Sequence, residues 1–123
     1  MTENAYWGYH LIINAGDCNR ESVMSAGTIY DFCKELVERI DMVAFGEPQI
    51  VKFGTGNKAG YTLVQLIETS NICAHFCDDS GDLYLDVFSC KTFEVNEVLF
   101  MVNKYFNPSR MNHTYLEIGR AHV

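Results

Sequence analysis

The sequence predicts an α+β fold: a two-layer sandwich in which one antiparallel sheet carries two helices on one face. Three observations lead to this prediction. Several short apolar runs are separated by turn-forming residues, two longer segments carry apolar residues at helical spacing, and 123 residues suit one domain with a real core. The chain has no repeats, linkers or low-complexity tracts, so we expect a single domain over residues 1–123.

The first half of the chain is expected to hold two strands and one long helix. Residues 9–15 form an apolar run that predicts a strand. Residues 20–42 predict one long amphipathic helix, because apolar side chains recur there at helical spacing. The chain then continues with a short strand over 49–53 and a loop rich in turn formers over 54–60. The apolar stripe of the helix consists of Val23, Ile29, Phe32, Cys33, Leu36, Val37 and Ile40.

The second half is expected to form a meander, a helix and a closing strand. The strand-type runs are 61–67, 72–77, 82–89 and 113–118, with a hairpin turn over 78–81. Residues 95–105 predict a second helix that stops near Asn107-Pro108. With both helices on one face, the other face of the sheet stays open, and a partly apolar open face is normally covered by a second copy.

The net charge, the apolar runs and the cysteines of the chain exclude several classes of function. A formal net charge of −7 argues against nucleic acid, because phosphate binding needs a basic face, and it favours a cationic ligand such as a sulfonium or an amine. The first residues do not resemble a signal peptide, and no apolar run approaches the roughly 18 residues needed to cross a membrane. The five cysteines form an odd set without disulfide-framework spacing. We therefore expect a cytoplasmic protein with free thiols and no membrane or nucleic-acid partner.

Three reactive side chains stand close together in the sequence. Ser70 offers a hydroxyl nucleophile, His75 an imidazole five residues on, and Cys90 a thiol fifteen residues beyond that. The intervening segments are short, so we expect the three to converge on one site. A serine at a sharp junction between two strands can attack its own preceding carbonyl. The pattern favours chemistry performed on the chain itself.

Plainer interpretations of these residues stay open. Ser70 also suits an ordinary turn, His75 a strand histidine with a hydrogen bond, and Cys90 a small buried hydrophobe. Cys73, His75 and Cys77 alternate along one strand and share a face, as part of a zinc site would. Structural zinc sites usually offer Cys-x-x-Cys pairs on turns, so we expect no metal.

Three blocks of the sequence resemble the short, bacterial-type S-adenosylmethionine decarboxylases. The first is GYHLIINAGDCN over residues 8–19, the second is Ser70 with His75, and the third is DVFSC over residues 86–90. The blocks occur in that family's order, and the spacing from the serine to the histidine and to the cysteine is kept without a gap. The likeness covers roughly residues 8–118, as a divergent member of the family.

The resemblance implies a pyruvoyl-dependent decarboxylase of polyamine synthesis that cuts itself between residues 69 and 70. In that family the serine hydroxyl attacks the preceding carbonyl, here that of Thr69, and the serine is converted into a pyruvoyl group. The resemblance assigns His75 as the base for this processing, Thr62 as a supporting hydroxyl and Cys90 as the proton donor in decarboxylation. It also implies a homodimer in which two sheets pack into a four-layer αββα sandwich.

The chain departs from the family pattern around the substrate. Thr69 stands where a glutamate is usual, and residues 54–60 replace an aromatic-bearing loop of which only Phe53 and Gly60 hold matching places. The segment after the histidine reads FCDD rather than Thr-Trp-Pro-Glu, so we expect weak stacking on a purine. Candidate substrate-binding residues are Phe53, Phe76 and Asp79. The alternatives are a pyruvoyl-dependent decarboxylase of ornithine or arginine, and an unprocessed, non-catalytic homologue that binds a ligand or partner.

Overall fold

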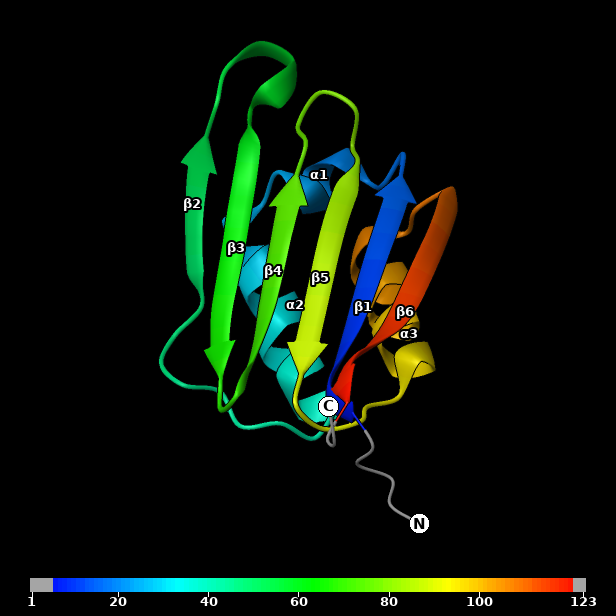
Figure 1. The fold of residues 1–123 in the computed structure, drawn as a ribbon. Helices are drawn as coiled ribbons and strands as arrows, with labels where there is room; N and C mark the ends of the chain where they lie inside the picture. Colours follow the sequence, from blue (N-terminus) through cyan, green and yellow to red (C-terminus); the bar gives the residue numbers. More distant parts are fainter. Residues whose placement is uncertain (1–5, 121–123) are drawn as a thin grey trace.

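In the computed structural model, which describes residues 6–120, one six-stranded antiparallel sheet carries the three α-helices on one face (Figure 1). The strand order is β2-β3-β4-β5-β1-β6. The predicted α+β class with helices on one side of an antiparallel sheet is confirmed. The elements in chain order are β1 (Tyr6–Gly16), α1 (Arg20–Val23), α2 (Ala26–Arg39), β2 (Gln49–Phe53), the 3-10 helix η1 (Gly56–Lys58), β3 (Gly60–Ile67), β4 (Ser70–Phe76), β5 (Leu83–Ser89), α3 (Val95–Phe106) and β6 (Arg110–Arg120).

The sheet topology combines a meander with one inserted strand. Strands β2 to β5 are consecutive neighbours, whereas β1 lies between β5 and β6 and pairs antiparallel with both. Leu11 of β1, for example, is opposite Val87 of β5 and Tyr115 of β6. This arrangement brings the N-terminal strand beside the two strands that are most distant from it in the sequence.

The hydrophobic core lies between the sheet and the helices. Alternate side chains of each strand point to the helix face, where Leu11, Ile72 and Val87 are fully buried. The rings of Phe32 in α2 and Phe106 in α3 meet edge to face, with their centroids 5.0 Å apart. Each large apolar side chain buried in this way contributes about 1.5–3 kcal/mol, so this layer supplies most of the driving force for folding.

The predicted single helix over residues 20–42 is wrong, because two helices, α1 and α2, occupy this segment. Ser25 has extended backbone angles, and its side-chain oxygen accepts a hydrogen bond from the backbone N–H of Thr28, which starts α2 as a new helix. Asn19 caps α1 in the same way through the N–H of Ser22. Helix α2 also ends earlier than predicted, since Asp41 adopts a left-handed conformation with φ of 59°.

The remaining predicted elements are confirmed, β2 with its predicted ends and the others with shifted ends. Strand β1 is longer than the predicted 9–15 and β6 is longer than 113–118, because the two strands pair with each other along their whole length. Strand β4 begins at Ser70 rather than at residue 72, since Ser70 is already paired with both Ile67 and Ser89. No helix among residues 6–120 is long and apolar enough to cross a bilayer. The five cysteines, all within this range, are free thiols.

The second face of the sheet, called the open face below, is not covered by any described part of the chain. Figure 1 shows this face in front, with α1, α2 and α3 behind the sheet. Polar and large apolar side chains lie next to each other on the open face, as the pairing of the strands shows. Exposed apolar side chains on this face are Val51, Phe53, Leu66, Tyr84 and Leu116.

Candidate functional site

A tight turn joins β3 to β4 and contains the peptide bond singled out from the sequence. Glu68 and Thr69 form the turn, and the flanking residues Ile67 and Ser70 are paired across it. Thr69 has a φ of 57°, in the left-handed region that is a genuine outlier for a β-branched residue. The Thr69–Ser70 bond therefore follows directly on a conformationally strained residue.

Cys90 lies against this turn. The residue directly follows β5, and its Sγ is 2.7 Å from Oγ1 of Thr69. The same hydroxyl donates a hydrogen bond to the carbonyl oxygen of Glu68 at 2.6 Å. Because Ser70 pairs with Ser89, the neighbour of Cys90, the structure brings Thr69, Ser70 and Cys90 together.

A cavity of about 230 Å³ opens beside this group of residues. Lys91 lines it, and the Lys91 ammonium donates a hydrogen bond to the backbone carbonyl of Asp41. Lys91 is not among the residues predicted from the sequence, although it directly follows Cys90. The full lining is Met42, Val43, Ile67, Glu68, Thr69, Ser70, Cys90 and Lys91.

His75 and Thr62 form a second group, on the open face. The two residues are opposite each other on β4 and β3, and Oγ1 of Thr62 is 3.2 Å from Nδ1 of His75. They line a cavity of about 540 Å³ together with Phe53. Gly60 makes the cavity wall possible, because a Cβ at that position would lie 1.6 Å from the carbonyl oxygen of Phe76. The other lining residues are Lys58, Tyr61, Phe76 and Cys77.

Within one copy of the chain, the structure does not bring His75 to Ser70 and Cys90. Ser70 and His75 both belong to β4, five residues apart. An extended strand advances about 3.3 Å per residue, so the two positions are separated by roughly 16 Å. Ser70 and Cys90 therefore form one half of the predicted site, and Thr62 and His75 form another half at the opposite end of the β3–β4 hairpin.

The three predicted substrate-binding residues differ in their surroundings. Phe53 is 59% exposed on the open face and lines the same cavity as His75. Phe76 also lines this cavity, but it is buried and its ring centroid lies 5.3 Å from that of Phe106, so it shapes the wall from the core side. Asp79 lies in the β4–β5 turn, where its backbone carbonyl accepts two hydrogen bonds from Arg20, and it lines neither of these cavities.

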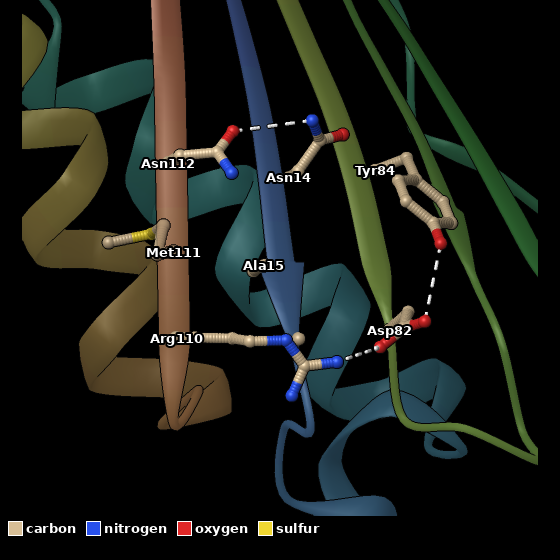
Figure 2. Close-up of a pocket in the computed structure, with 8 residues that line it drawn as sticks. Asn14, Ala15, Asp82, Tyr84, Arg110, Met111 and Asn112 are labelled. Atoms are coloured by element: carbon tan, nitrogen blue, oxygen red, sulfur yellow. Dashed lines mark hydrogen bonds and ion pairs between the residues drawn. The ribbon is translucent and has the colours of Figure 1, made fainter.

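A third cavity, of about 220 Å³, lies at the other end of β5 from Cys90 (Figure 2). Arg110 reaches across β1 toward Asp82, with Nη2 of the arginine 3.8 Å from Oδ1 of the aspartate. Gly16 permits this path, because a Cβ there would lie 2.5 Å from the guanidinium carbon of Arg110. The hydroxyl of Tyr84 donates to Asp82, and Asn14 donates to Asn112 at the far side of the cavity.

The residues around this third cavity stabilise the ionised carboxylate of Asp82. Partial burial alone raises the pKa of its carboxyl, but hydrogen bonds from Ser80, from the Asp17 N–H and from Tyr84 outweigh burial and hold the pKa below its usual range. No pattern in the sequence predicts this cluster. Its members come from β1, from β6, and from β5 with Asp82 directly before it, and the non-sequential strand order places them together.

The zinc alternative receives no support from the arrangement of side chains. Among residues 6–120, no three His, Cys, Asp or Glu side chains are grouped closely enough to hold a metal ion. Burial, followed by the charge of Asp86, raises the pKa of the Cys73 thiol, and burial with Asp82 raises that of Cys77. Neutral thiols are poor metal ligands, since the thiolate is the binding form.

Comparisons with known proteins agree on one family. A family model described as S-adenosylmethionine decarboxylase matches residues 9–119. Two proteins of Clostridium botulinum, from strains Loch Maree / Type A3 and Hall / ATCC 3502, are each named S-adenosylmethionine decarboxylase proenzyme. Each is 24% identical to this chain over 95 residues, covering 76% of this chain and 78% of the relative.

The fold has a close structural counterpart. It matches the crystal structure of the adenosylmethionine decarboxylase from Aquifex aeolicus VF5 with a TM-score of 0.78, covering 93% of this chain and 92% of the other. The sequence identity in that match is 17%, so the likeness concerns the fold.

Proposed function

The chain belongs to the S-adenosylmethionine decarboxylase family, as its sequence resemblance suggested, and on this premise we propose that it is a self-processing, pyruvoyl-dependent decarboxylase of S-adenosylmethionine in polyamine synthesis. One observation carries the proposal. The Thr69–Ser70 bond lies in a strained two-residue turn, and the Cys90 thiol is held against that turn. This is the arrangement that processing at a serine and later proton donation by a cysteine require.

Self-processing begins at the turn. The Ser70 Oγ attacks the carbonyl carbon of Thr69, the peptide bond becomes an ester, and the hydroxyl proton passes to the Ser70 nitrogen. A base then removes the Ser70 Cα proton, the Cβ–Oγ bond breaks, and Thr69 leaves with a terminal carboxylate. Water hydrolyses the resulting dehydroalanine, ammonia departs, and residue 70 remains as the pyruvoyl group. The left-handed conformation of Thr69 favours the cut, because the strain is released when the turn opens.

The residues around Ser70 fit a prosthetic group made in place. The cavity of about 230 Å³ gives room beside Ser70, and Lys91 contributes a positive charge to its wall. Once formed, the pyruvoyl group supplies an electron sink for the loss of CO₂ from an amine-bearing substrate. Cys90 holds on Sγ the proton that the substrate carbon needs after CO₂ departs, and the cavity that it lines is where this transfer takes place.

A second copy of the chain completes the site in this proposal. His75 lies roughly 16 Å from Ser70 along β4, so it serves as the processing base for a different copy. In a twofold-symmetric dimer, the open faces of two copies would pack against each other. The Thr62–His75 end of one β3–β4 hairpin would then lie next to the Thr69–Cys90 end of the other. The exposed Phe53, Leu66 and Leu116 on this face support such packing. The assembly is a homodimer with a four-layer αββα sandwich and two shared sites.

S-adenosylmethionine suits the charge of the protein, because the acidic chain attracts a sulfonium cation. Phe53 is the exposed aromatic side chain in the cavity that contains His75, and we assign it to the adenine. Stacking is worth on the order of 1 kcal/mol per contact, so a single platform predicts weak binding and slow turnover at low substrate concentration.

The experiment is a measurement of CO₂ release from carboxyl-labelled S-adenosylmethionine, ornithine, arginine and lysine by the cleaved protein, with light scattering on the same sample. We expect a dimer that releases CO₂ from S-adenosylmethionine with a high KM. Strong release from a basic amino acid alone would replace the substrate but keep the pyruvoyl mechanism. Release from none of the four by fully cleaved protein would contradict the substrate assignment, and a monomer would contradict the shared site.

A further inference from the structure

We propose that Thr69 is a positioning residue for Cys90, and that its hydroxyl aims the thiol proton at the turn where the prosthetic group forms. The use of that proton rests on the proposed function, whereas the positioning itself rests on contacts in the uncut chain. Oγ1 of Thr69 lies 2.7 Å from Sγ of Cys90 and 2.6 Å from the carbonyl oxygen of Glu68.

The two contacts fix the direction of the hydrogen bonds. A threonine hydroxyl has one proton and two lone pairs. Since that proton is donated to the carbonyl of Glu68, the contact with Cys90 uses a lone pair, and the thiol is the donor. The chain of bonds runs from the Cys90 S–H to the Thr69 hydroxyl and on to the Glu68 carbonyl. The S–H bond of Cys90 is thus directed at the Thr69 hydroxyl, within the turn that contains the Thr69–Ser70 bond.

Separate anchors hold the two partners in this position. The turn is tied to the segment after α2, because the Glu68 N–H donates to the carbonyl of Val43 at 3.2 Å. Cys90 is held by its own loop, in which the Lys91 N–H donates to Oγ of Ser89 at 3.0 Å. The hydroxyl–thiol contact is therefore a side-chain link between two segments whose backbones already pair at Ser70 and Ser89.

Thr69 also leaves the nucleophile free. Within residues 6–120, the Ser70 hydroxyl makes no hydrogen bond, and the hydroxyl beside Cys90 is that of Thr69. Ser70 is the first residue of β4, and its hydroxyl is available for attack on the Thr69 carbonyl. Thr69 lies in the turn, and its hydroxyl is the one that contacts the Cys90 thiol. A valine at position 69 would keep the shape and lose the hydroxyl, whereas a serine would keep the hydroxyl.

The test uses the uncut chain, so that it does not depend on processing. Ser70→Ala protein is prepared alone, with Thr69→Val and with Thr69→Ser, and the rate of alkylation of each cysteine by iodoacetamide is followed by peptide mass spectrometry. Cys73 is the internal control, since its sulfur contacts Asn71 and is distant from the turn. We expect Thr69→Val to change the Cys90 rate relative to Cys73 by about fivefold, the equivalent of one hydrogen bond, and Thr69→Ser to restore it. Equal Cys90 rates in all three proteins would overturn the proposal.

A second measurement follows the same two variants in cleaved protein with Ser70 intact. Normalised to the cleaved fraction, Thr69→Val should lower kcat for decarboxylation with KM unchanged, and Thr69→Ser should recover it. An unchanged kcat in the valine variant would overturn the proposed role in proton donation. If the parent protein is never cleaved, the proposed function fails, while the alkylation rates still decide whether Thr69 positions Cys90.

Discussion

Thr62 and His75 face each other across β3 and β4, with Oγ1 of the threonine 3.2 Å from Nδ1 of the histidine. Thr69 and Cys90 make the corresponding contact at the other end of the same hairpin. Under the proposed function, a single copy therefore carries the two halves of the site at opposite ends of the β3–β4 hairpin. Pairing of two copies is the simplest way to bring a base to Ser70.

This arrangement predicts complementation between two inactive variants. Ser70→Ala alone should not be cut, and His75→Ala alone should stop at the ester, where hydroxylamine cuts it. When the two variants are co-expressed, the Ser70→Ala copy supplies His75 and the His75→Ala chain should be cut. Gel analysis with differently tagged copies measures this result. If the His75→Ala chain stays uncut in the mixed dimer, the base does not come from the partner copy.

Replacement of Cys90 should separate cofactor formation from turnover. We expect Cys90→Ala to leave cleavage largely intact and to reduce kcat by about 10²-fold or more, because general acid catalysis typically contributes that much. Labelled CO₂ release, normalised to the cleaved fraction, gives the value. Equal turnover in the variant and the parent protein would show that Cys90 is a packing residue.

Gly60 should be essential for the cavity that contains His75. Gly60→Ala is expected to lower the free energy of unfolding by about 1–3 kcal/mol, because the added Cβ would overlap the Phe76 carbonyl and push β3 away from β4. Gly27→Ala is the matched control, since a Cβ there meets only Oγ of Ser25 at 3.8 Å. The control should be stabilising by about 0.5 kcal/mol in a helix. The free energy of unfolding of both variants is measured by urea denaturation. Equal values for Gly60→Ala and Gly27→Ala would mean that position 60 has room for a Cβ.

The stability contribution of Asp82 should depend on pH. Its hydrogen bonds hold the carboxyl pKa below the usual value, so the charged form is the one that stabilises the fold. The contribution is complete above the usual aspartate pKa of about 3.9 and is lost as pH falls through the lower folded value. Asp82→Asn should thus be less stable than the parent protein at pH 7, with the difference shrinking below about pH 4. If the stability difference between the two proteins instead grows as the pH falls, the pKa of Asp82 is not lowered in the folded state.

Local sequence patterns predict the parts of the fold that depend on neighbouring residues. Cys90 lies near Ser70 because a meander places the end of β5 beside the start of β4, and alternating apolar residues predict that meander. The break before α2 was also readable from Ser25, a typical N-cap, but the continuous apolar stripe dominated the prediction.

Three other features depend on geometry that the sequence does not display. His75 is close to Ser70 in number but not in space, because an extended strand separates residues that a helix or turn would bring together. The Arg110–Asp82 contact requires β1 to be inserted beside β5 and β6, a pairing between distant parts of the chain. The turn also imposes a left-handed conformation on Thr69, although β-branched residues disfavour positive φ angles.

Intact mass spectrometry of the purified protein tests the central claim most directly. Self-processing predicts two fragments, one ending at Thr69 and one beginning with residue 70 as a pyruvoyl group, and Ser70→Ala protein should give only the full-length chain. A parent chain that remains whole after prolonged incubation, and that hydroxylamine does not cut, would contradict self-processing and leave a ligand- or partner-binding homologue as the better account.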